Sequence, residues 1–248
     1  MSNYDNFALY YDILTDDVDY SSRTDYLLKL FDKHHRMPTL LLDMACGTGS
    51  FSLEFAKRNI DVIGVDMSEG MLAVADERSK KENADILFLN QSAQELELYG
   101  TVDGAVCCLD SVNHIVRINE LKKAFKRISL FLEKDCLFIF DVNTLYKQSR
   151  ILGNNTFVIE NDDVYCVWQN FFDNKSKITD IYIDLFAKTG DEYSRLCENF
   201  SERVYSDEQL IDALESAGLK TEAIYGEMTV KKPTKNCMRK VFVTRKVK

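Results

Sequence analysis

Two glycines and one aspartate are spaced as in sites that bind a nucleoside. Gly47 and Gly49 follow an apolar run of strand type and precede a run of helical type. Glycines at such a turn let the backbone approach a ligand, because no Cβ stands in the way. Asp66 lies 17 residues beyond Gly49, at the end of the next apolar run, where a carboxylate can accept hydrogen bonds from both ribose hydroxyls. Together these residues predict a ligand that contains a nucleoside.

The acid Asp43 distinguishes between two classes of nucleoside ligand. A dinucleotide-binding fingerprint, G-x-G-x-x-G, needs a third glycine at the position of Ser52. A carboxylate at Asp43 would repel a pyrophosphate, but it would attract the ammonium and sulfonium groups of S-adenosylmethionine (SAM). These charges favour SAM over NAD, so an NAD-dependent oxidoreductase is the less favoured enzyme class.

The residues around this turn alternate between strand and helix patterns. Such alternation predicts an α/β fold with a doubly wound, mostly parallel seven-stranded sheet and ligands at the carboxyl ends of the strands. Strands are expected at 39–44, 61–66, 86–90, 102–109 and 137–142. Helices are expected at 50–58, at 69–81 after the cap residue Ser68, and from Asn119 onwards.

After Asn143 the apolar residues alternate with period two, which predicts an antiparallel β insert after the fifth strand. Beyond it, Ser206 and Gln209 form a capping box, and Gly218 ends the resulting helix. The insert strands are expected at 157–160, 164–172, 178–187 and 193–205, and the last core strands at 219–225 and 238–244. We therefore expect a SAM-binding core of residues 1–144 and 206–248, with 145–205 as a lid over the acceptor.

Charge and composition exclude several classes of protein. The chain has 31 basic and 40 acidic residues, a net charge of −9, which on average repels nucleic acid and anionic membranes. Its first twenty residues are acidic and rich in tyrosine, unlike a signal peptide, and no apolar run approaches the ~18 residues of a membrane span. We expect no membrane association and a cytoplasmic location.

The seven cysteines and three histidines show no metal-binding spacing, so reduced core thiols and no metal are expected.

One basic segment departs from the acidic average. Between Lys231 and Lys248 there are eight basic residues and no acidic ones. We interpret this segment as a solvated edge strand and tail whose lysines discourage edge-to-edge pairing. A binding track for tRNA is the alternative.

Several segments resemble the motifs of class I SAM-dependent methyltransferases. The matching segments are 42–49 (motif I, LDxACGTG), 62–72 (the following vxGvDxSxxML), 103–111 (motif II) and 130–141 (motif III). Within the last, Lys134-Asp135-Cys136 replaces the usual PGG. Residues 10–12 and 202–219 are similar to small stand-alone bacterial members, the YqeM-like group. The resemblance covers nearly the whole chain and is specific within 39–144.

The resemblance implies a role for each matching residue. Asp43 and the two glycines would hold the methionine moiety of SAM, Asp66 the ribose and Met67 the adenine. Ser92 stands where the family usually has an aspartate beside the adenine amino group. The implied cofactor-binding residues are Tyr11, Asp43, Ala45, Gly47, Gly49, Asp66, Met67, Ser92, Ala93 and Leu109.

Asp110 and His114 are the candidate catalytic residues. Methyl transfer is an in-line displacement in which alignment alone can supply ~7–11 kcal/mol of the barrier. Asp110 would orient an amine acceptor or take its proton, and His114 could act as a general base. The structural alternatives are a turn or cap residue at Asp110 and a helix start at His114.

The acceptor is expected to be a small molecule or a peptide. Base-amine methylation in the familiar way uses a [DNS]-P-P-[YFW] loop, and this chain has Leu109-Asp110-Ser111-Val112 there. No proline precedes Cys107 or Cys108, as it usually does before the cysteine nucleophile of a pyrimidine C5 methyltransferase. A tRNA methyltransferase and a non-catalytic SAM-binding module that forms a homodimer through the insert are the alternatives.

Overall fold

The computed structural model describes residues 4–190 and 192–247 and contains two β-sheets. The helices are α1 (Tyr4–Leu14), α2 (Tyr20–Lys33), α3 (Ser50–Ala56), α4 (Glu69–Lys81), α5 (Ile118–Phe131) and α6 (Asp207–Ser216). The core strands are β1 (Leu40–Met44), β2 (Asp61–Asp66), β3 (Leu87–Asn90), β4 (Val102–Cys107), β5 (Leu132–Asn143), β10 (Leu219–Gly226) and β11 (Arg239–Lys246). The insert strands are β6 (Thr156–Glu160), β7 (Val164–Asp173), β8 (Ile178–Thr189) and β9 (Glu192–Arg203).

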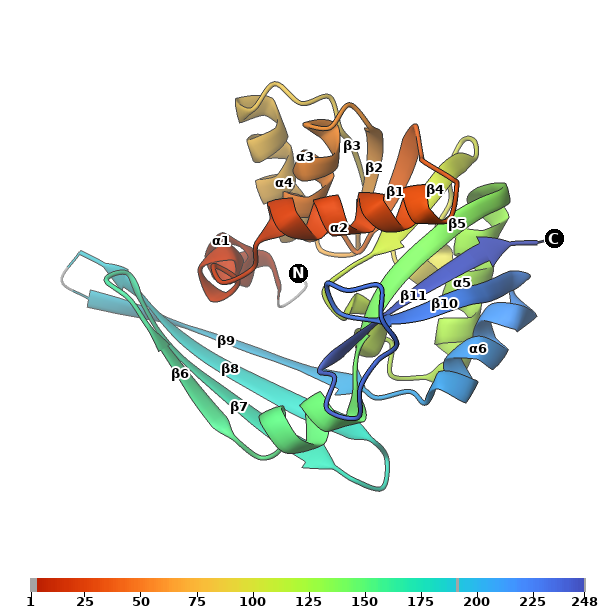
Figure 1. Cartoon of the computed structure of the whole chain (residues 1–248). Helices are drawn as coiled ribbons and strands as arrows, with labels where there is room; N and C mark the ends of the chain where they lie inside the picture. The colour runs from red at the N-terminus through yellow and green to blue at the C-terminus, as the bar shows by residue number, and fades with distance from the viewer. Residues whose placement is uncertain (1–3, 191, 248) are drawn as a thin grey trace.

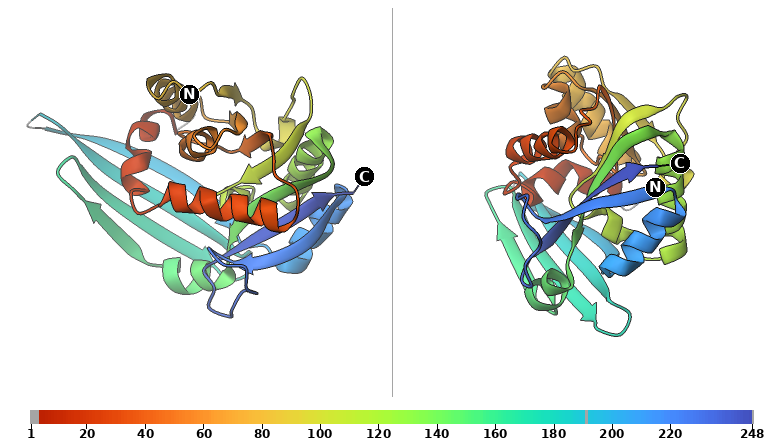
Figure 2. Two further views of the ribbon diagram at one scale, coloured as in Figure 1. Left: turned by 45° about the horizontal axis from the view of Figure 1, so that its top comes forward. Right: turned by 45° about the vertical axis from the view of Figure 1, so that its right-hand side comes forward.

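The seven-stranded sheet has the strand order β10-β11-β5-β4-β1-β2-β3, and β11 runs antiparallel to both of its neighbours. This confirms the predicted doubly wound, mostly parallel α/β fold. Helices α2 and α3 pack on one face of the sheet, and α5 and α6 pack on the other (Figures 1 and 2). The carboxyl ends of β1, β2, β4 and β5 therefore meet along one edge.

Local signals in the sequence set several element boundaries. Asn59 has the left-handed conformation expected between α3 and β2, with φ of 60°. Ser68 caps α4 by accepting a hydrogen bond from the backbone N–H of Met71, and Ser206 and Gln209 form the predicted capping box. These boundaries match the sequence prediction because each depends only on neighbouring residues.

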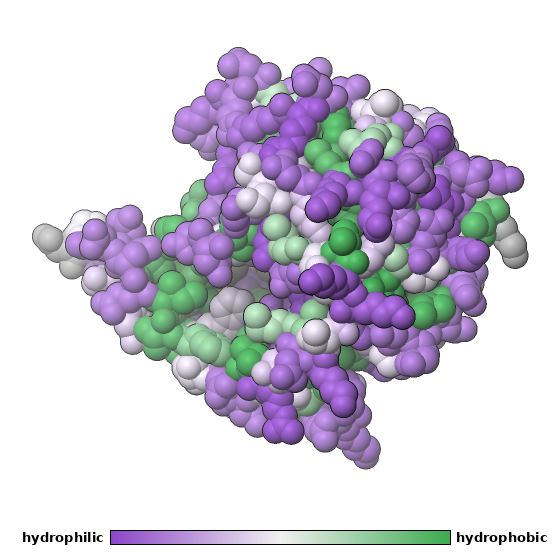
Figure 3. Space-filling view, viewed as in Figure 1, coloured by the Kyte–Doolittle hydropathy of each residue, from purple (hydrophilic) through white to green (hydrophobic). Residues whose placement is uncertain are grey.

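The insert forms a separate four-stranded antiparallel sheet that extends away from the core (Figures 1 and 2). One of its faces packs against α1 and α4, through buried residues that include Ala8, Met71, Cys166 and Ile181. In the space-filling view a hollow separates the insert from the core, and hydrophobic surface lies on the insert beside it (Figure 3). The division into core and lid stays a prediction.

Some elements were not predicted or have different bounds. Helices α1 and α2 and the π-helix Lys147–Leu152 were not predicted. The start of α2 does carry a local signal, since the Asp19 carboxylate accepts a hydrogen bond from Ser22 N. Strand β5 begins at Leu132 rather than at 137, and β4 ends at Cys107, so that Leu109 lies in a turn.

The interpretation of the basic segment as a solvated edge strand is wrong. Strand β11 lies inside the sheet, between β10 and β5. Arg239 is 7% exposed and pairs with carboxylates, because a buried guanidinium needs counter-charges. Lys240 pairs with Asp207, and Arg245 pairs with Glu222. Among the described residues, no helix combines the length and the apolar character needed to cross a membrane.

Candidate active site

The turn between β1 and α3 is built from residues with positive φ. Ala45, Gly47 and Gly49 have φ of 58°, 56° and 77°. A Cβ on Gly47 would meet nothing within 4 Å, whereas a Cβ on Gly49 would lie 2.9 Å from the Cβ of Ala75. Gly49 is therefore required for packing against α4, and Gly47 leaves open space at the turn.

Asp66 holds this turn in place. Its Oδ2 accepts a hydrogen bond from Gly47 N at 2.8 Å, and its Oδ1 accepts one from Ser68 N at 2.9 Å. Burial raises the pKa of Asp66, against the effect of these backbone hydrogen bonds. The backbone N–H of Gln91 donates to the Asp66 carbonyl at 3.0 Å, so the loop toward Ser92 starts beside Asp66.

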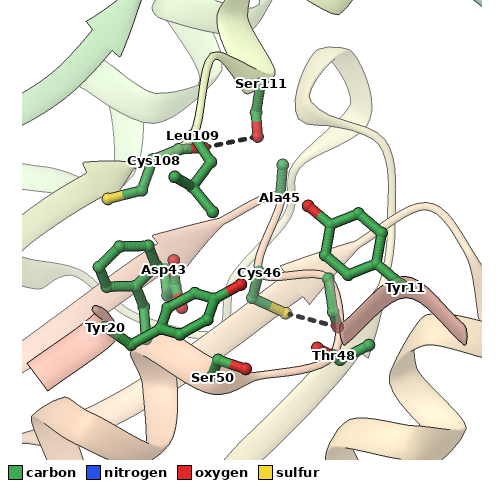
Figure 4. Close-up of a pocket in the computed structure, with 12 residues that line it drawn as sticks. Tyr11, Tyr20, Asp43, Ala45, Cys46, Thr48, Ser50, Cys108, Leu109 and Ser111 are labelled. Atoms are coloured by element: carbon green, nitrogen blue, oxygen red, sulfur yellow. Dashed lines mark hydrogen bonds between the residues drawn. The ribbon is translucent and has the colours of Figure 1, made fainter. Parts of the chain in front are cut away.

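A cavity opens at the carboxyl ends of β1 and β4, below α1 and α2. It is lined by Tyr11, Tyr20, Asp43, Ala45, Cys46, Gly47, Thr48, Ser50, Phe51, Cys108, Leu109 and Ser111. The hydroxyls of Tyr11 and Tyr20 point toward the space between Ala45, Asp43 and Leu109 (Figure 4). The cavity is thus polar along the turn and is covered by two aromatic rings.

Asp43 is an acid without a cationic partner. It is 1% exposed and accepts a hydrogen bond from Ser52 Oγ at 2.6 Å. No cationic side chain in the described part of the chain pairs with it. Burial raises the pKa of Asp43 to about 7. A buried carboxylate that lines a cavity and lacks a counter-charge fits a cationic ligand such as the methionine moiety of SAM.

Asp12 holds helix α1 beside this cavity through contacts with two other elements. The Asp12 carboxylate pairs with Arg78 of α4 and accepts a hydrogen bond from Thr48 Oγ1 at 2.8 Å. Arg78 also donates to Ser50 Oγ at 3.1 Å. These contacts place Tyr11, the neighbour of Asp12, at the cavity. Burial raises the pKa of Tyr11, so its hydroxyl stays protonated.

A second cluster lies where the insert meets the core. The ligand atoms of Asp110, His114 and Glu202 all lie within 4.8 Å of one another. His114 Nε2 is 3.8 Å from Glu202 Oε1, and its ring centroid is 4.9 Å from that of Phe200. Such a spacing can hold an ammonium group or a divalent cation between the side chains.

The two carboxylates of this cluster have opposite pKa shifts. Burial would raise the pKa of Asp110, but the charges of Arg239, Lys147 and His114 outweigh it and hold the pKa below its usual range. Burial and the charge of Asp110 raise the pKa of Glu202. Asp110 is therefore a fixed negative charge, and Glu202 is the better proton acceptor of the two.

The turn that carries Asp110 has an unusual backbone. Leu109 and Asp110 have φ of 51° and 55°, in a region that non-glycine residues seldom adopt. The carboxylate of Asp141, in β5, accepts hydrogen bonds from both of their backbone N–H groups, at 2.9 and 2.7 Å. Arg239 in turn pairs with Asp141 at 2.5 Å and with Asp110 at 2.6 Å.

The structure gathers part of the predicted site around the cavity. The predicted residues that line it are Tyr11, Asp43, Ala45, Gly47 and Leu109. Asp66 does not line the cavity, but it accepts a hydrogen bond from Gly47, which does. The remaining predicted cofactor-binding residues, Gly49, Met67, Ser92 and Ala93, do not line the cavity either. Met67 is 68% exposed, and Ser92 Oγ donates to Glu95. His114 ends a short 3₁₀ turn, Ser111–His114, instead of starting a helix. The site residues to which the sequence analysis gave no individual role include Tyr20, Thr48, Ser50, Asp141, Glu202 and Arg239.

Comparisons with known proteins identify the family of this chain. A methyltransferase-domain family model matches residues 41–135. The YqeM protein of Bacillus subtilis (strain 168) is 29% identical over 248 residues, covering 99% of this chain and 98% of its own. A solved SAM-dependent methyltransferase from Clostridium acetobutylicum ATCC 824 is 30% identical, with a TM-score of 0.89 and 99% of both chains covered.

Two further proteins are similar over part of the chain or in fold alone. The glycine/sarcosine N-methyltransferase of Parasynechococcus marenigrum (strain WH8102) is 26% identical, over 60% of this chain and 54% of its own. The sugar N-methyltransferase KedS8 of Streptoalloteichus sp ATCC 53650 is 17% identical and shares the fold, with a TM-score of 0.78 over 96% of this chain and 93% of its own. The match to the C. acetobutylicum enzyme spans 99% of both chains, so this chain belongs to the SAM-dependent methyltransferases and uses SAM as its cofactor.

Proposed function

We propose that this enzyme methylates an amine nitrogen of a small molecule or peptide. The observation that carries the proposal is the cluster at the junction of core and insert. There, two carboxylates, Asp110 and Glu202, flank the imidazole of His114. An amine in water is mostly an ammonium ion, so two negative charges would bind it and hold its nitrogen beside Leu109 and the cavity.

The proton balance of the reaction also fits this cluster. Bound SAM supplies an electrophilic methyl group on a sulfonium, which departs as a neutral thioether. The attacking nitrogen must first lose a proton to expose its lone pair. We assign this proton to Glu202, directly or through His114, because the pKa of Glu202 is raised. Asp110, with its lowered pKa, orients the amine and keeps its charge.

Two of the similar proteins support an amine acceptor. The P. marenigrum and Streptoalloteichus proteins are both named as N-methyltransferases, one for glycine and sarcosine and one for a sugar. The acidic charge of this chain, −9, favours the same choice, because it attracts cations and repels polyanions.

The cofactor contacts that follow from the motifs are part of the same proposal. Asp43 and Gly47 would hold the methionine moiety, and Asp66 the ribose hydroxyls. Met67, exposed beside Asp66, would cover the adenine ring, with Ser92 and Ala93 at the edge of that ring. The insert would close the acceptor side, since Glu202 comes from β9.

The experiment that tests the proposal is a turnover screen. The protein and SAM are incubated with amines, carboxylates, phenols, thiols, peptides and bulk tRNA, with and without EDTA, and S-adenosylhomocysteine release is measured. We expect release with a class of primary or secondary amines, unchanged by EDTA. Release only with phenols, thiols or tRNA would contradict the proposal, as would SAM binding without turnover on any acceptor.

Replacing Glu202 with glutamine is expected to raise the KM for the amine at least about tenfold, because a hydrogen bond to a charge is worth ~1.5–3 kcal/mol. SAM affinity should stay within about twofold. The matched control is Glu198→Gln, since Glu198 is equally buried on the same strand but four residues away. Steady-state kinetics and calorimetry measure both quantities. Equal losses in the two variants would point to a general effect of the insert.

We also predict that the protein does not bind nucleic acid tightly. Arg239, Lys240 and Arg245 pair with acids of the chain itself. Lys231, Lys232 and Lys235 are exposed in the loop between β10 and β11 and are the basic groups to test. The measurement is filter binding of tRNA and duplex DNA over a salt series. Submicromolar binding at physiological salt, lost when these three lysines become glutamines, would overturn the prediction.

A further inference from the structure

Arg239 is a buried cation that the motifs do not explain. It starts β11, about 100 residues after Asp141, yet its guanidinium contacts three carboxylates. Nη2 lies 2.6 Å from Asp110 Oδ1, Nη1 lies 2.5 Å from Asp141 Oδ1, and Nε lies 3.4 Å from Glu227 Oε1. Its five N–H donors in a planar fork suit such a set of partners.

Two of these partners determine how the turn at 109–110 is held. Asp141 accepts hydrogen bonds from the backbone N–H groups of Leu109 and Asp110. The Asp110 carboxylate in turn pairs with Arg239 and accepts a hydrogen bond from Asn143 Nδ2, both at 2.6 Å. Both turn residues have positive φ, which costs of order 1–3 kcal/mol each and persists only when the surroundings enforce it. The Arg239 guanidinium therefore links Asp141, which binds the backbone of the turn, to the side chain of Asp110.

We infer that Arg239 is a positioning residue of the methyltransferase, which fixes the Asp110 carboxylate and the Leu109–Asp110 turn against the cavity. It lies behind the carboxylates and touches neither acceptor nor cofactor in this role. The inference rests on the proposed function in one respect, namely that Asp110 orients the acceptor. It also assigns Arg239, one of the basic residues between Lys231 and Lys248, a role that does not involve nucleic acid.

The test compares Arg239→Met and Arg239→Lys with a matched control, Arg245→Met. Arg245 is also an ion-paired arginine of β11, but it bonds Glu222 and lies at the other end of the strand. We expect Arg239→Met to raise the acceptor KM at least tenfold and to leave SAM affinity within about threefold. Arg239→Lys should recover part of the loss, because it keeps the charge but not the fork. Arg245→Met should leave both values unchanged.

A double-mutant cycle with Asp110→Asn shows whether Arg239 acts through Asp110. If it does, Asp110→Asn combined with Arg239→Met costs little more than the larger single loss. Losses that multiply would overturn the inference. If Asp110→Asn alone leaves the acceptor KM unchanged, the proposed role of Asp110 fails, whatever Arg239 does.

A second readout needs no acceptor and covers the case in which a variant is destabilised. In an ¹⁵N-labelled protein, the amide signals of Leu109 and Asp110 report their bonds to Asp141. Arg239→Met should shift these two signals, while amides of α3 and α4 stay in place and the variant remains folded. Unshifted signals in a folded Arg239→Met variant would refute the positioning role. A global change of the spectrum would refute it as well, by showing that Arg239 serves the fold as a whole.

Discussion

Replacing Asp66 with alanine is expected to weaken SAM binding about 10- to 150-fold. Hydrogen bonds to a charged group such as the Asp66 carboxylate contribute ~1.5–3 kcal/mol, which corresponds to this loss of affinity. The structure adds a reason, because Asp66 Oδ2 also accepts the N–H of Gly47, in the turn that borders the cavity. Asp66→Asn keeps one acceptor oxygen and should lose less. Isothermal titration calorimetry with SAM measures all three proteins.

The control for this prediction is Ser68→Ala. Both Asp66 and Ser68 contact the start of α4, but only the Ser68 hydroxyl caps it, by accepting the N–H of Met71. We expect Ser68→Ala to lower the free energy of unfolding by about 1 kcal/mol and to leave SAM affinity unchanged. Equal losses of SAM affinity in both variants would show that Asp66 acts only through the helix start.

The sequence predicted the parts of the site that depend on short stretches of chain. The turn with Gly47 and Gly49 could be recognised because tight strand-to-helix turns need glycine. Asp66 could be recognised because the end of a buried strand places a carboxylate at the ligand edge. The alternation of strands and helices predicted a doubly wound, mostly parallel sheet, and the strand pairing confirms that fold.

The second layer of the site could not be predicted from the same signals. Arg239 lies in a run of basic residues that has the composition of a solvated tail, and only the strand order shows it buried beside β5. Glu202 lies in a strand whose residues alternate between the two faces of the insert sheet. This alternation indicates the face on which Glu202 lies, but not the residue that it contacts. Glu202 lies 88 positions after its partner His114, and Arg239 lies 129 positions after its partner Asp110, so no local pattern encodes these contacts.

SAM affinity is expected to rise with pH through the titration of Asp43. This acid is buried, has a pKa of about 7 without ligand, and lines the cavity. A cationic ligand prefers the ionised carboxylate, so below pH 7 binding must first expel a proton. With a pKa of 7 in the free protein and a much lower one in the complex, affinity should rise about 25-fold between pH 5.5 and 7.5. Calorimetry in buffers of different ionisation enthalpy would also detect the released proton.

The stability of the free protein should change in the opposite direction over the same range. A carboxyl group whose folded pKa is raised contributes stability that is fully present below its unfolded pKa of ~3.9 and is lost as pH rises through 7. Asp43→Asn, which keeps the size and the contact with Ser52, should flatten both trends, whereas Asp61→Asn at the exposed start of β2 should flatten neither.

A wild-type affinity that does not change with pH, while stability does, would place the Asp43 charge away from the bound cation. Parallel changes in both would mean that other groups dominate. If affinity rises and stability falls with pH, and both trends disappear in Asp43→Asn, one buried carboxylate accounts for both. Its counter-charge is then supplied by the bound ligand.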